Sequence, residues 1–220
     1  MTRGPILAST RVAEMKKNSE CPHCGDTGWI VAPDCSTTRC PCILDKTLRT
    51  VLPPKFHGAK LADFDPDIRR DVSEFILKPT EGLMLWGPTG SGKTHLACAM
   101  VRSLYEARKR PVFVRAADFY AELRESYRDP LALPSEMDIL RKYAGAMWLV
   151  LDDIASGSLS DHERRSLLDL IDRRGNALLP TVVTTNFGLE DVARLVDERL
   201  ASRLGSYYRI GVLNQDRRSA

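Results

Sequence analysis

The sequence predicts an α/β protein with an open parallel sheet and helices on both faces. Three observations support this prediction. A glycine-rich, phosphate-binding motif spans residues 87–94, between an apolar run and a helical pattern. Short apolar runs then alternate with amphipathic helical stretches, which is typical of parallel sheets. A later apolar run, residues 148–151, is followed by two aspartates. Aspartate is the residue type that holds Mg²⁺ beside a nucleotide.

The first part of the chain differs in composition from the rest. Five of the six cysteines fall between positions 21 and 42, and such clustering in a reducing compartment favours metal ligation over disulfides. A weak helix follows, and the sequence Leu52-Pro53-Pro54 then breaks any helix and marks a linker. We therefore expect an N-terminal segment, residues 1–50 with a cysteine-rich module over about 21–42, and a main domain, residues 51–220.

The main domain holds five strand candidates, each a short apolar run, at 83–86, 112–115, 148–151, 181–185 and 207–212. Helical patterns lie between and after them, at 93–108, 118–127, 135–143, 161–174 and 189–204. This alternation predicts a five-stranded parallel sheet in one main core.

The loop at 87–94 reads GPTGSGKT and predicts a nucleoside triphosphate site. Its glycines let backbone N–H groups turn inward to phosphate oxygens, while Lys93 reaches the β- and γ-phosphates and the Thr94 hydroxyl coordinates Mg²⁺. The helix that follows adds its positive dipole end. The expected nucleotide-binding residues are Gly87, Pro88, Thr89, Gly90, Ser91, Gly92, Lys93, Thr94 and Asp152.

Carboxylate and amide side chains follow two of the predicted strands. We expect Asp152 to hold Mg²⁺ together with Thr94, and Asp153 to orient or deprotonate an attacking water. Asn186 ends the next strand, where ligands of parallel sheets gather, and from there its amide would reach the γ-phosphate or the water. Two alternatives stay open: the aspartates start a solvated loop, or Asn186 belongs to the N-cap region of the next helix.

Four motifs in this order resemble the AAA+ ATPases of the DnaC/IstB helicase-loader group: GPTGSGKTHLA at 87–97, LVLDDI at 149–154, TVVTTNF at 181–187 and ERLASRL at 198–204. The resemblance covers roughly residues 55–218 and implies a P-loop NTPase of AAA+ type that uses ATP and Mg²⁺. It also implies that Asn186 acts as sensor 1.

Spacing alone favours an ordinary exposed basic face for Arg199 and Arg203, paired with Asp197 and Glu198. The resemblance instead implies that Arg203 is the arginine finger that reaches a neighbouring subunit's γ-phosphate, with Arg199 as a second candidate. A finger supplied in trans implies a weak monomeric ATPase and self-association into an ATP-dependent oligomer. Little sequence follows the last predicted strand, so we expect no C-terminal helical lid, and Arg217 is a candidate nucleotide contact from the terminal turn.

The resemblance also implies single-stranded DNA binding through a helical insertion after the second strand. The matching stretch, residues 118–143, carries Arg124, Arg128, Arg141 and Lys142 with Phe119, Tyr120 and Tyr127. Such a mixture suits phosphate contact and base stacking. The alternative is a basic solvated helix whose aromatic side chains pack inward.

The cysteines form a C-x-x-C pair, Cys21 and Cys24, and a C-x-C pair, Cys40 and Cys42. Four thiolates would hold structural Zn²⁺ tetrahedrally, in a zinc-ribbon-like module with a short hairpin strand at 26–31. Cys35 and His23 are spare ligand candidates, and reduced, non-ligating cysteines are the alternative. The arrangement resembles N-terminal modules of some bacterial and phage helicase loaders, where this region docks on the replicative helicase.

These observations lead to the hypothesis of an ATP-hydrolysing helicase loader that delivers a hexameric replicative helicase to single-stranded DNA in DNA replication. The alternatives are an IstB-like transposition helper, a small-molecule kinase, and an ATP switch with little hydrolysis. The net charge of +3 permits nucleic-acid contact without demanding it. No apolar run approaches a membrane span, and the N-terminus lacks the apolar core of a signal peptide, so we expect a cytoplasmic protein with no membrane contact.

Overall fold

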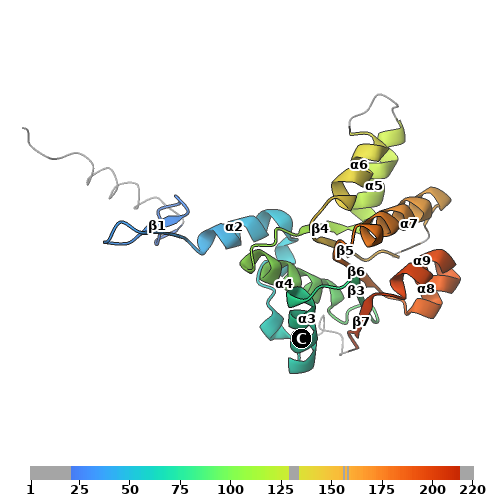
Figure 1. The fold of residues 1–220 in the computed structure, drawn as a ribbon, viewed down its shortest axis with the longest axis horizontal. Helices are drawn as coiled ribbons and strands as arrows, with labels where there is room; N and C mark the ends of the chain where they lie inside the picture. Colours follow the sequence, from blue (N-terminus) through green and yellow to red (C-terminus); the bar gives the residue numbers. More distant parts are fainter. Residues whose placement is uncertain (1–20, 129–133, 156, 158, 214–220) are drawn as a thin grey trace, which may run out of the picture. The chain divides into compact units, whose positions relative to one another are not determined.

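The computed structural model describes residues 21–128, 134–155, 157 and 159–213. Contacts within the chain divide it into two units, Met1–Pro53 and Pro54–Ala220, whose described parts are drawn in Figure 1. The division falls between the two prolines of the expected linker. Residues 1–20, the middle of the 118–143 stretch and Arg217 lie outside the described residues.

The N-terminal unit contains a hairpin and one helix. Strand β1 (Trp29–Val31) pairs antiparallel with β2 (Thr37–Arg39), and Trp29 lies opposite Arg39. The Arg39 guanidinium lies 5.6 Å from the centre of the Trp29 ring, within the range of a cation–π contact. Helix α2 (Cys42–Val51) follows directly. The strand expected between the two cysteine pairs is therefore present.

The second unit is built on the predicted five-stranded sheet. Its strands are β3 (Gly82–Trp86), β4 (Val112–Arg115), β5 (Leu149–Asp152), β6 (Thr181–Thr185) and β7 (Tyr208–Gly211). They are parallel and ordered β4-β5-β6-β3-β7. The carboxyl ends of β3, β5 and β6 therefore meet at one edge of the sheet, which is where ligands bind in open parallel sheets.

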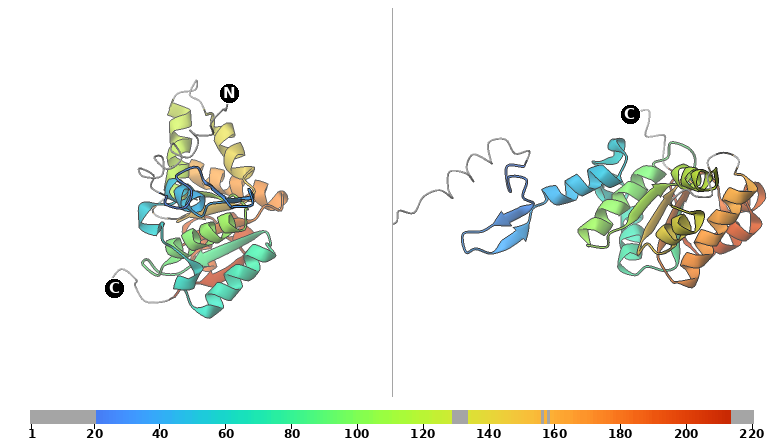
Figure 2. Two further views of the ribbon diagram at one scale, coloured as in Figure 1. Left: turned by 90° about the vertical axis from the view of Figure 1, so that its left-hand side faces the viewer. Right: turned by 90° about the horizontal axis from the view of Figure 1, so that it is seen from above.

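Helices cover both faces of this sheet (Figure 2). They are α3 (Pro66–Leu77), α4 (Lys93–Glu106), α5 (Ala116–Arg128), α6 (Glu136–Ala144), α7 (Asp161–Asn176), α8 (Leu189–Leu195) and α9 (Glu198–Leu204), with two 3₁₀ turns, η1 (Pro54–Phe56) and η2 (Leu61–Asp63). Helix α4 lies against β3, β5 and β6 on one face. On the other face, Met84, Leu151 and Val183 pack in one core with Leu167 and Ile171 of α7. Every helix in the described part of the chain is too short or too polar to cross a bilayer.

Two details of the helices differ from the sequence prediction. The single helix expected over 189–204 is two helices, because Asp197 leaves the helical conformation and its carboxylate accepts hydrogen bonds from the N–H groups of Arg199 and Leu200. This is an N-cap that starts a new helix. Helix α3 was not predicted, since its buried residues Val72, Phe75 and Ile76 are a sparse apolar set within a charged stretch.

A buried arginine of α7 connects the end of α6 to the start of β6. Arg174 of α7 is fully buried, and it donates hydrogen bonds to the carbonyl oxygens of Ala144 and Ala146 at the end of α6, at 3.1 and 2.7 Å. It also donates to the Thr181 hydroxyl at 2.7 Å, where β6 begins. Burial lowers the pKa of Arg174 to about 10, so the guanidinium stays charged at neutral pH beside the negative end of α6.

Candidate functional site

The phosphate-binding loop has the backbone conformation that its glycines predict. Gly87, Gly90 and Gly92 have φ angles of 150°, 86° and 101°, which L-residues rarely adopt. A Cβ atom on Gly87 would lie 2.2 Å from the carbonyl oxygen of Val212, so a side chain at this position would collide with the segment after β7. Helix α4 begins at Lys93, and its N-terminus therefore faces the loop, as phosphate binding requires.

Lys93 is held inside the loop. Its side chain is largely buried, and Nζ donates hydrogen bonds of 2.8 Å to the carbonyl oxygens of Gly87 and Pro88. The two carbonyl oxygens hold the ammonium group in the loop, where its positive charge and the backbone N–H groups suit an anion.

Asp152 lies at the end of β5 and is bound by two threonine hydroxyl groups. Thr94 Oγ1 donates to both carboxylate oxygens, at 3.0 and 3.1 Å, and Thr184 Oγ1 donates to Oδ1 at 2.7 Å. Burial raises the pKa of Asp152, and the hydrogen bonds from Thr184 and Thr94 act in the opposite direction. The two predicted magnesium ligands, Thr94 and Asp152, are thus in direct contact, and the oxygen donors suit a hard cation.

Sequence reasoning missed Thr184. This residue is buried in β6, and its hydroxyl also accepts a 2.8 Å hydrogen bond from the backbone N–H of Asp153. Threonine is a common strand residue, which masks such a role in the sequence. A polar side chain at the carboxyl end of a buried strand, next to the strand that carries Asp152, was the available signal.

Asp153 and Asn186 lie in the same cleft as the phosphate-binding loop. The cleft has a volume of about 190 Å³ and is lined by Thr89, Gly90, Gly92, Lys93, Thr94, Asp153, Thr184, Asn186, Lys55, Phe56 and His95. Asp153 has a left-handed backbone, with φ of 60°, which turns the chain at the end of β5 and sends successive aspartates in different directions. The arrangement brings the predicted phosphate-binding loop, the acid Asp153 and the amide Asn186 together.

Three cleft residues, Lys55, Phe56 and His95, were not predicted to bind nucleotide. Lys55 and Phe56 belong to η1, far from the loop in the sequence, and His95 follows Thr94 directly. Their position in the cleft depends on how the segment before the sheet packs on α4, which no local motif reveals.

Arg199 and Arg203 lie on α9 and are not among the residues that line this cleft. Arg203 Nε donates to Asp172 Oδ1 of α7, so its carboxylate partner is not Asp197 or Glu198. Asp197 instead caps the helix through the backbone N–H of Arg199. A role for either arginine in a neighbouring subunit's site stays a prediction.

The predicted DNA-binding stretch is mostly committed to other contacts. Phe119 and Tyr120 are buried in the core, so the prediction that they stack on bases is wrong, because both face inward from α5. The basic side chains all lie beside carboxylates, in the pairs Arg124–Glu163, Arg128–Glu125, Arg141–Asp138 and Lys142–Glu122. Tyr127 is exposed, and its ring packs on His162 at 4.7 Å. This geometry favours the alternative of inward-facing aromatic residues and solvated ion pairs.

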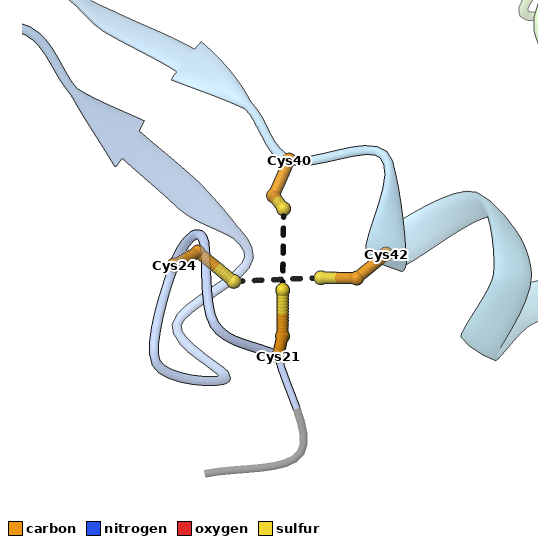
Figure 3. Close-up of side chains that lie close together, drawn as sticks. All are labelled: Cys21, Cys24, Cys40 and Cys42. Atoms are coloured by element: carbon orange, nitrogen blue, oxygen red, sulfur yellow. Dashed lines mark hydrogen bonds between the residues drawn. The ribbon is translucent and has the colours of Figure 1, made fainter. Parts of the chain in front are cut away.

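The four predicted cysteine ligands lie together in the N-terminal unit (Figure 3), and neither Cys35 nor His23 belongs to the group. Their sulfur atoms are all within 4.8 Å of one another, with Cys21–Cys40 at 3.6 Å and Cys24–Cys42 at 3.4 Å. A tetrahedral site with Zn–S bonds of about 2.3 Å has sulfur–sulfur edges of roughly 3.8 Å, so the cluster fits one zinc ion.

Local contacts favour a thiolate at Cys24. Its sulfur accepts a 3.3 Å hydrogen bond from the backbone N–H of Gly28, an arrangement that stabilises metal-bound sulfur. Burial opposes ionisation of this thiol, but hydrogen bonds from Cys42 and Gly28 outweigh it and hold its pKa at about 7. The cluster thus contains a group that ionises readily and neighbours positioned to share one cation.

Known proteins resemble the second unit in sequence. A family model of IstB-like ATP binding proteins matches residues 68–205. The chain belongs to this family. The replicative helicase loader DnaC of Escherichia coli K12 is 29% identical to this IstB-like protein over 118 residues, 54% of this chain and 47% of DnaC. An insertion sequence IS1162 ATP-binding protein of Pseudomonas fluorescens is 28% identical over 132 residues, 56% of this chain and 55% of that protein. The chain thus spans about half the length of these relatives.

Solved structures resemble this IstB-like protein in fold. The crystal structure of the DnaC helicase loader matches with a TM-score of 0.63 and 25% identity, over 74% of this chain and 100% of that one. The crystal structure of DnaI matches with a TM-score of 0.62 and 22% identity, over 73% and 94% of the two chains. The IstB-like chain therefore has the α/β fold of the P-loop AAA+ ATPases, as predicted.

Proposed function

We propose that this IstB-like protein is an ATP-hydrolysing loader that delivers a hexameric replicative helicase to single-stranded DNA during DNA replication. The observation that supports the proposal is a cleft that brings the phosphate-binding loop together with Asp153 and Asn186, on a fold that matches the DnaC helicase loader along its whole solved chain. We place the protein in the cytoplasm, where such a partner would be found.

In this proposal, the residues of the site divide into those that bind phosphate and Mg²⁺ and those that act on the attacking water. Backbone N–H groups of the loop and Lys93 bind the phosphates, and Thr94 with Asp152 holds Mg²⁺, which would neutralise phosphate charge when bound. Thr184 positions Asp152. Asp153 orients the attacking water, and Asn186 contacts the γ-phosphate or that water from the end of β6.

Hydrolysis is tested by comparing ATP turnover of the wild type with that of Lys93→Ala and Asp153→Asn, with Mg²⁺ and single-stranded DNA present. We expect both variants to fall to background, Lys93→Ala through lost phosphate binding and Asp153→Asn with ATP affinity retained. Glu106→Gln, an exposed change at the far end of α4, serves as the control. Equal background rates in all four proteins would instead support an ATP switch that does not hydrolyse.

In this proposal, the helicase binds the N-terminal unit, whose four cysteines would hold a structural zinc ion. Isolating the tagged protein from its native host, with ATP and Mg²⁺, should recover a replicative helicase that mass spectrometry identifies. Recovery should be lost in the double variant Cys21→Ser, Cys24→Ser. A helicase recovered equally by both proteins would remove the docking role from the zinc module.

A transposition helper is the second candidate function. It is favoured by the family model of IstB-like proteins and by the relative from insertion sequence IS1162. Recovery of a transposase in the same isolation experiment would select it. In both functions we expect assembly into an oligomer, in which Arg203 acts on the neighbouring subunit's nucleotide.

A further inference from the structure

A short segment ahead of the sheet, residues 54–64, packs along α4, the helix that carries Lys93 and Thr94. Two side chains on one face of α4 hold this segment. Near the middle of the helix, Arg102 donates hydrogen bonds to the carbonyl oxygens of His57 and Ala59, at 2.6 and 3.0 Å. Two turns earlier, His95 Nε2 lies 2.9 Å from Asp63 Oδ2. The segment is therefore anchored at two points to the helix that begins the phosphate site.

Contacts on several sides fix the His95 ring. Asp63 Oδ2 also accepts a 2.9 Å hydrogen bond from the backbone N–H of Lys60. This bond, with the hydrogen bond from His95, lowers the pKa of the Asp63 carboxyl. An ionised carboxylate at Nε2 sets the orientation of the ring and the tautomer of its neutral form. The buried ring of Phe64 meets His95 edge-on, at 5.2 Å and 81°.

The fixed ring lines the same cleft as the phosphate-binding loop. His95 follows the magnesium-binding Thr94 and lines the cleft together with Lys55 and Phe56. The ring centres of Phe56 and His95 are 6.0 Å apart, at an angle of 46°. Phosphate recognition needs no aromatic residue, whereas a nucleotide base gains binding energy by stacking on one.

We propose that Asp63 and His95 are a positioning pair that holds Phe56 in register with the phosphate loop, so that the cleft recognises an aromatic base together with the triphosphate. The inference rests on the proposed function as an ATP-binding protein and names the group that sets its base recognition. Asp63 acts through His95, and the ring of Phe56 is the group that touches the base.

Positioning Phe56 for base binding can be distinguished from merely holding the segment on α4. Arg102 still anchors the segment through His57 and Ala59 when the pair is lost. The segment then stays on α4, while the ring against which Phe56 packs loses its fixed orientation. Lys93 Nζ is held within the loop by the carbonyl oxygens of Gly87 and Pro88. Loss of the pair should therefore weaken binding of a ligand with a base and spare binding of a bare polyphosphate.

The test compares the full chain with Asp63→Ala, His95→Ala and the control Glu106→Gln, using Mg²⁺ complexes of ATP and of inorganic tripolyphosphate. We expect both alanine variants to bind ATP about tenfold more weakly, the scale of one lost stacking contact, and tripolyphosphate within about twofold of the wild type. Asp63→Asn should restore most of the ATP affinity, since its amide oxygen still accepts from Lys60 and His95. In turnover, KM for ATP should rise while kcat stays within about twofold.

An equal loss for both ligands would overturn the proposal, because the pair would then support the phosphate loop. Unchanged ATP affinity in folded variants would also overturn it. Where a variant on α4 does not fold, Phe56→Leu repeats the test away from that helix, and it should show the same loss for ATP alone. A wild-type protein that binds neither ligand would instead refute the proposed function, on which the pair depends.

Discussion

Replacing Thr184 with valine removes a hydroxyl group that contacts Asp152, the proposed magnesium ligand. That hydroxyl donates to Asp152 Oδ1 at 2.7 Å and accepts from the backbone N–H of Asp153 at 2.8 Å. Valine has nearly the same volume, so the change leaves little cavity and isolates the two hydrogen bonds. A bond to a charged group contributes about 1.5–3 kcal/mol and a neutral one about 1 kcal/mol. We therefore expect a loss of about 2–4 kcal/mol in unfolding free energy.

The same substitution should change the pH dependence of ATP turnover. Burial already raises the pKa of Asp152, and Thr184 provides the strongest opposing hydrogen bond. Without that bond the pKa rises further, and every unit of increase corresponds to about 1.4 kcal/mol. More of the carboxyl is then protonated at a given pH and unable to bind Mg²⁺. The acid limb of kcat/KM should move to higher pH in Thr184→Val.

Stability without Mg²⁺ should respond to pH in a defined direction. A carboxyl whose folded pKa lies above its unfolded value binds a proton more readily in the folded state, so its contribution to stability falls as pH rises through that interval. In Thr184→Val, the folded pKa of Asp152 should lie further above its unfolded pKa than in the wild type. The stability difference between the variant and the wild type should therefore shrink as the pH is lowered.

Two measurements check this reasoning, both made from about pH 5 to pH 8.5. One is ATP turnover with saturating Mg²⁺, and the other is thermal unfolding without it. Thr184→Ser keeps the hydroxyl group and is the matched control, expected to follow the wild type in both. If Thr184→Val keeps the wild-type acid limb and melting temperature, the hydroxyl does not position Asp152 and the reasoning fails.

Three further predictions concern other parts of the described chain. Arg174→Met should lower the unfolding free energy by about 3–5 kcal/mol in urea denaturation, since it removes a buried cation and leaves its carbonyl partners without that donor. We expect metal analysis to find one zinc ion in the wild type and none in Cys24→Ser, whose N-terminal unit should also become sensitive to proteolysis while ATP affinity stays unchanged. Arg203→Ala should reduce turnover of the assembled protein by about 10³-fold or more at unchanged ATP affinity, and mixing it with Asp153→Asn should restore part of that turnover if the finger acts in trans.

The sequence could predict the sheet and the phosphate end of the site because both depend on local patterns. Buried parallel strands are continuous apolar runs, and the spacing of GPTGSGKT by itself predicts which groups would meet the phosphates. Asp152 was predictable for the same reason, since it ends a strand in which every residue is buried. These features require only neighbouring residues and the rule that parallel strands end at one edge.

The remaining site residues depend on packing between distant segments. Thr184 looks like an ordinary strand residue until β6 is placed beside β5. Phe56 lies in the cleft on a segment that Arg102 and His95 hold on α4. The wrong prediction that Phe119 and Tyr120 stack on bases has a related cause. Aromatic residues suit both a core and a stacking surface, and only the burial of one face of α5 distinguishes the two.

The ion pair between Arg203 and Asp172 bears on whether this arginine can act on a neighbour. Both side chains are partly exposed, at 59% and 32%, and surface ion pairs contribute only about 0–1 kcal/mol. A finger that accelerates phosphoryl transfer by about 10³-fold supplies roughly 4 kcal/mol to the transition state. A neighbouring γ-phosphate would therefore displace Asp172 at small cost. Until assembly, the pair would hold the guanidinium against Asp172 of α7, so that less side-chain entropy remains to be lost when subunits meet.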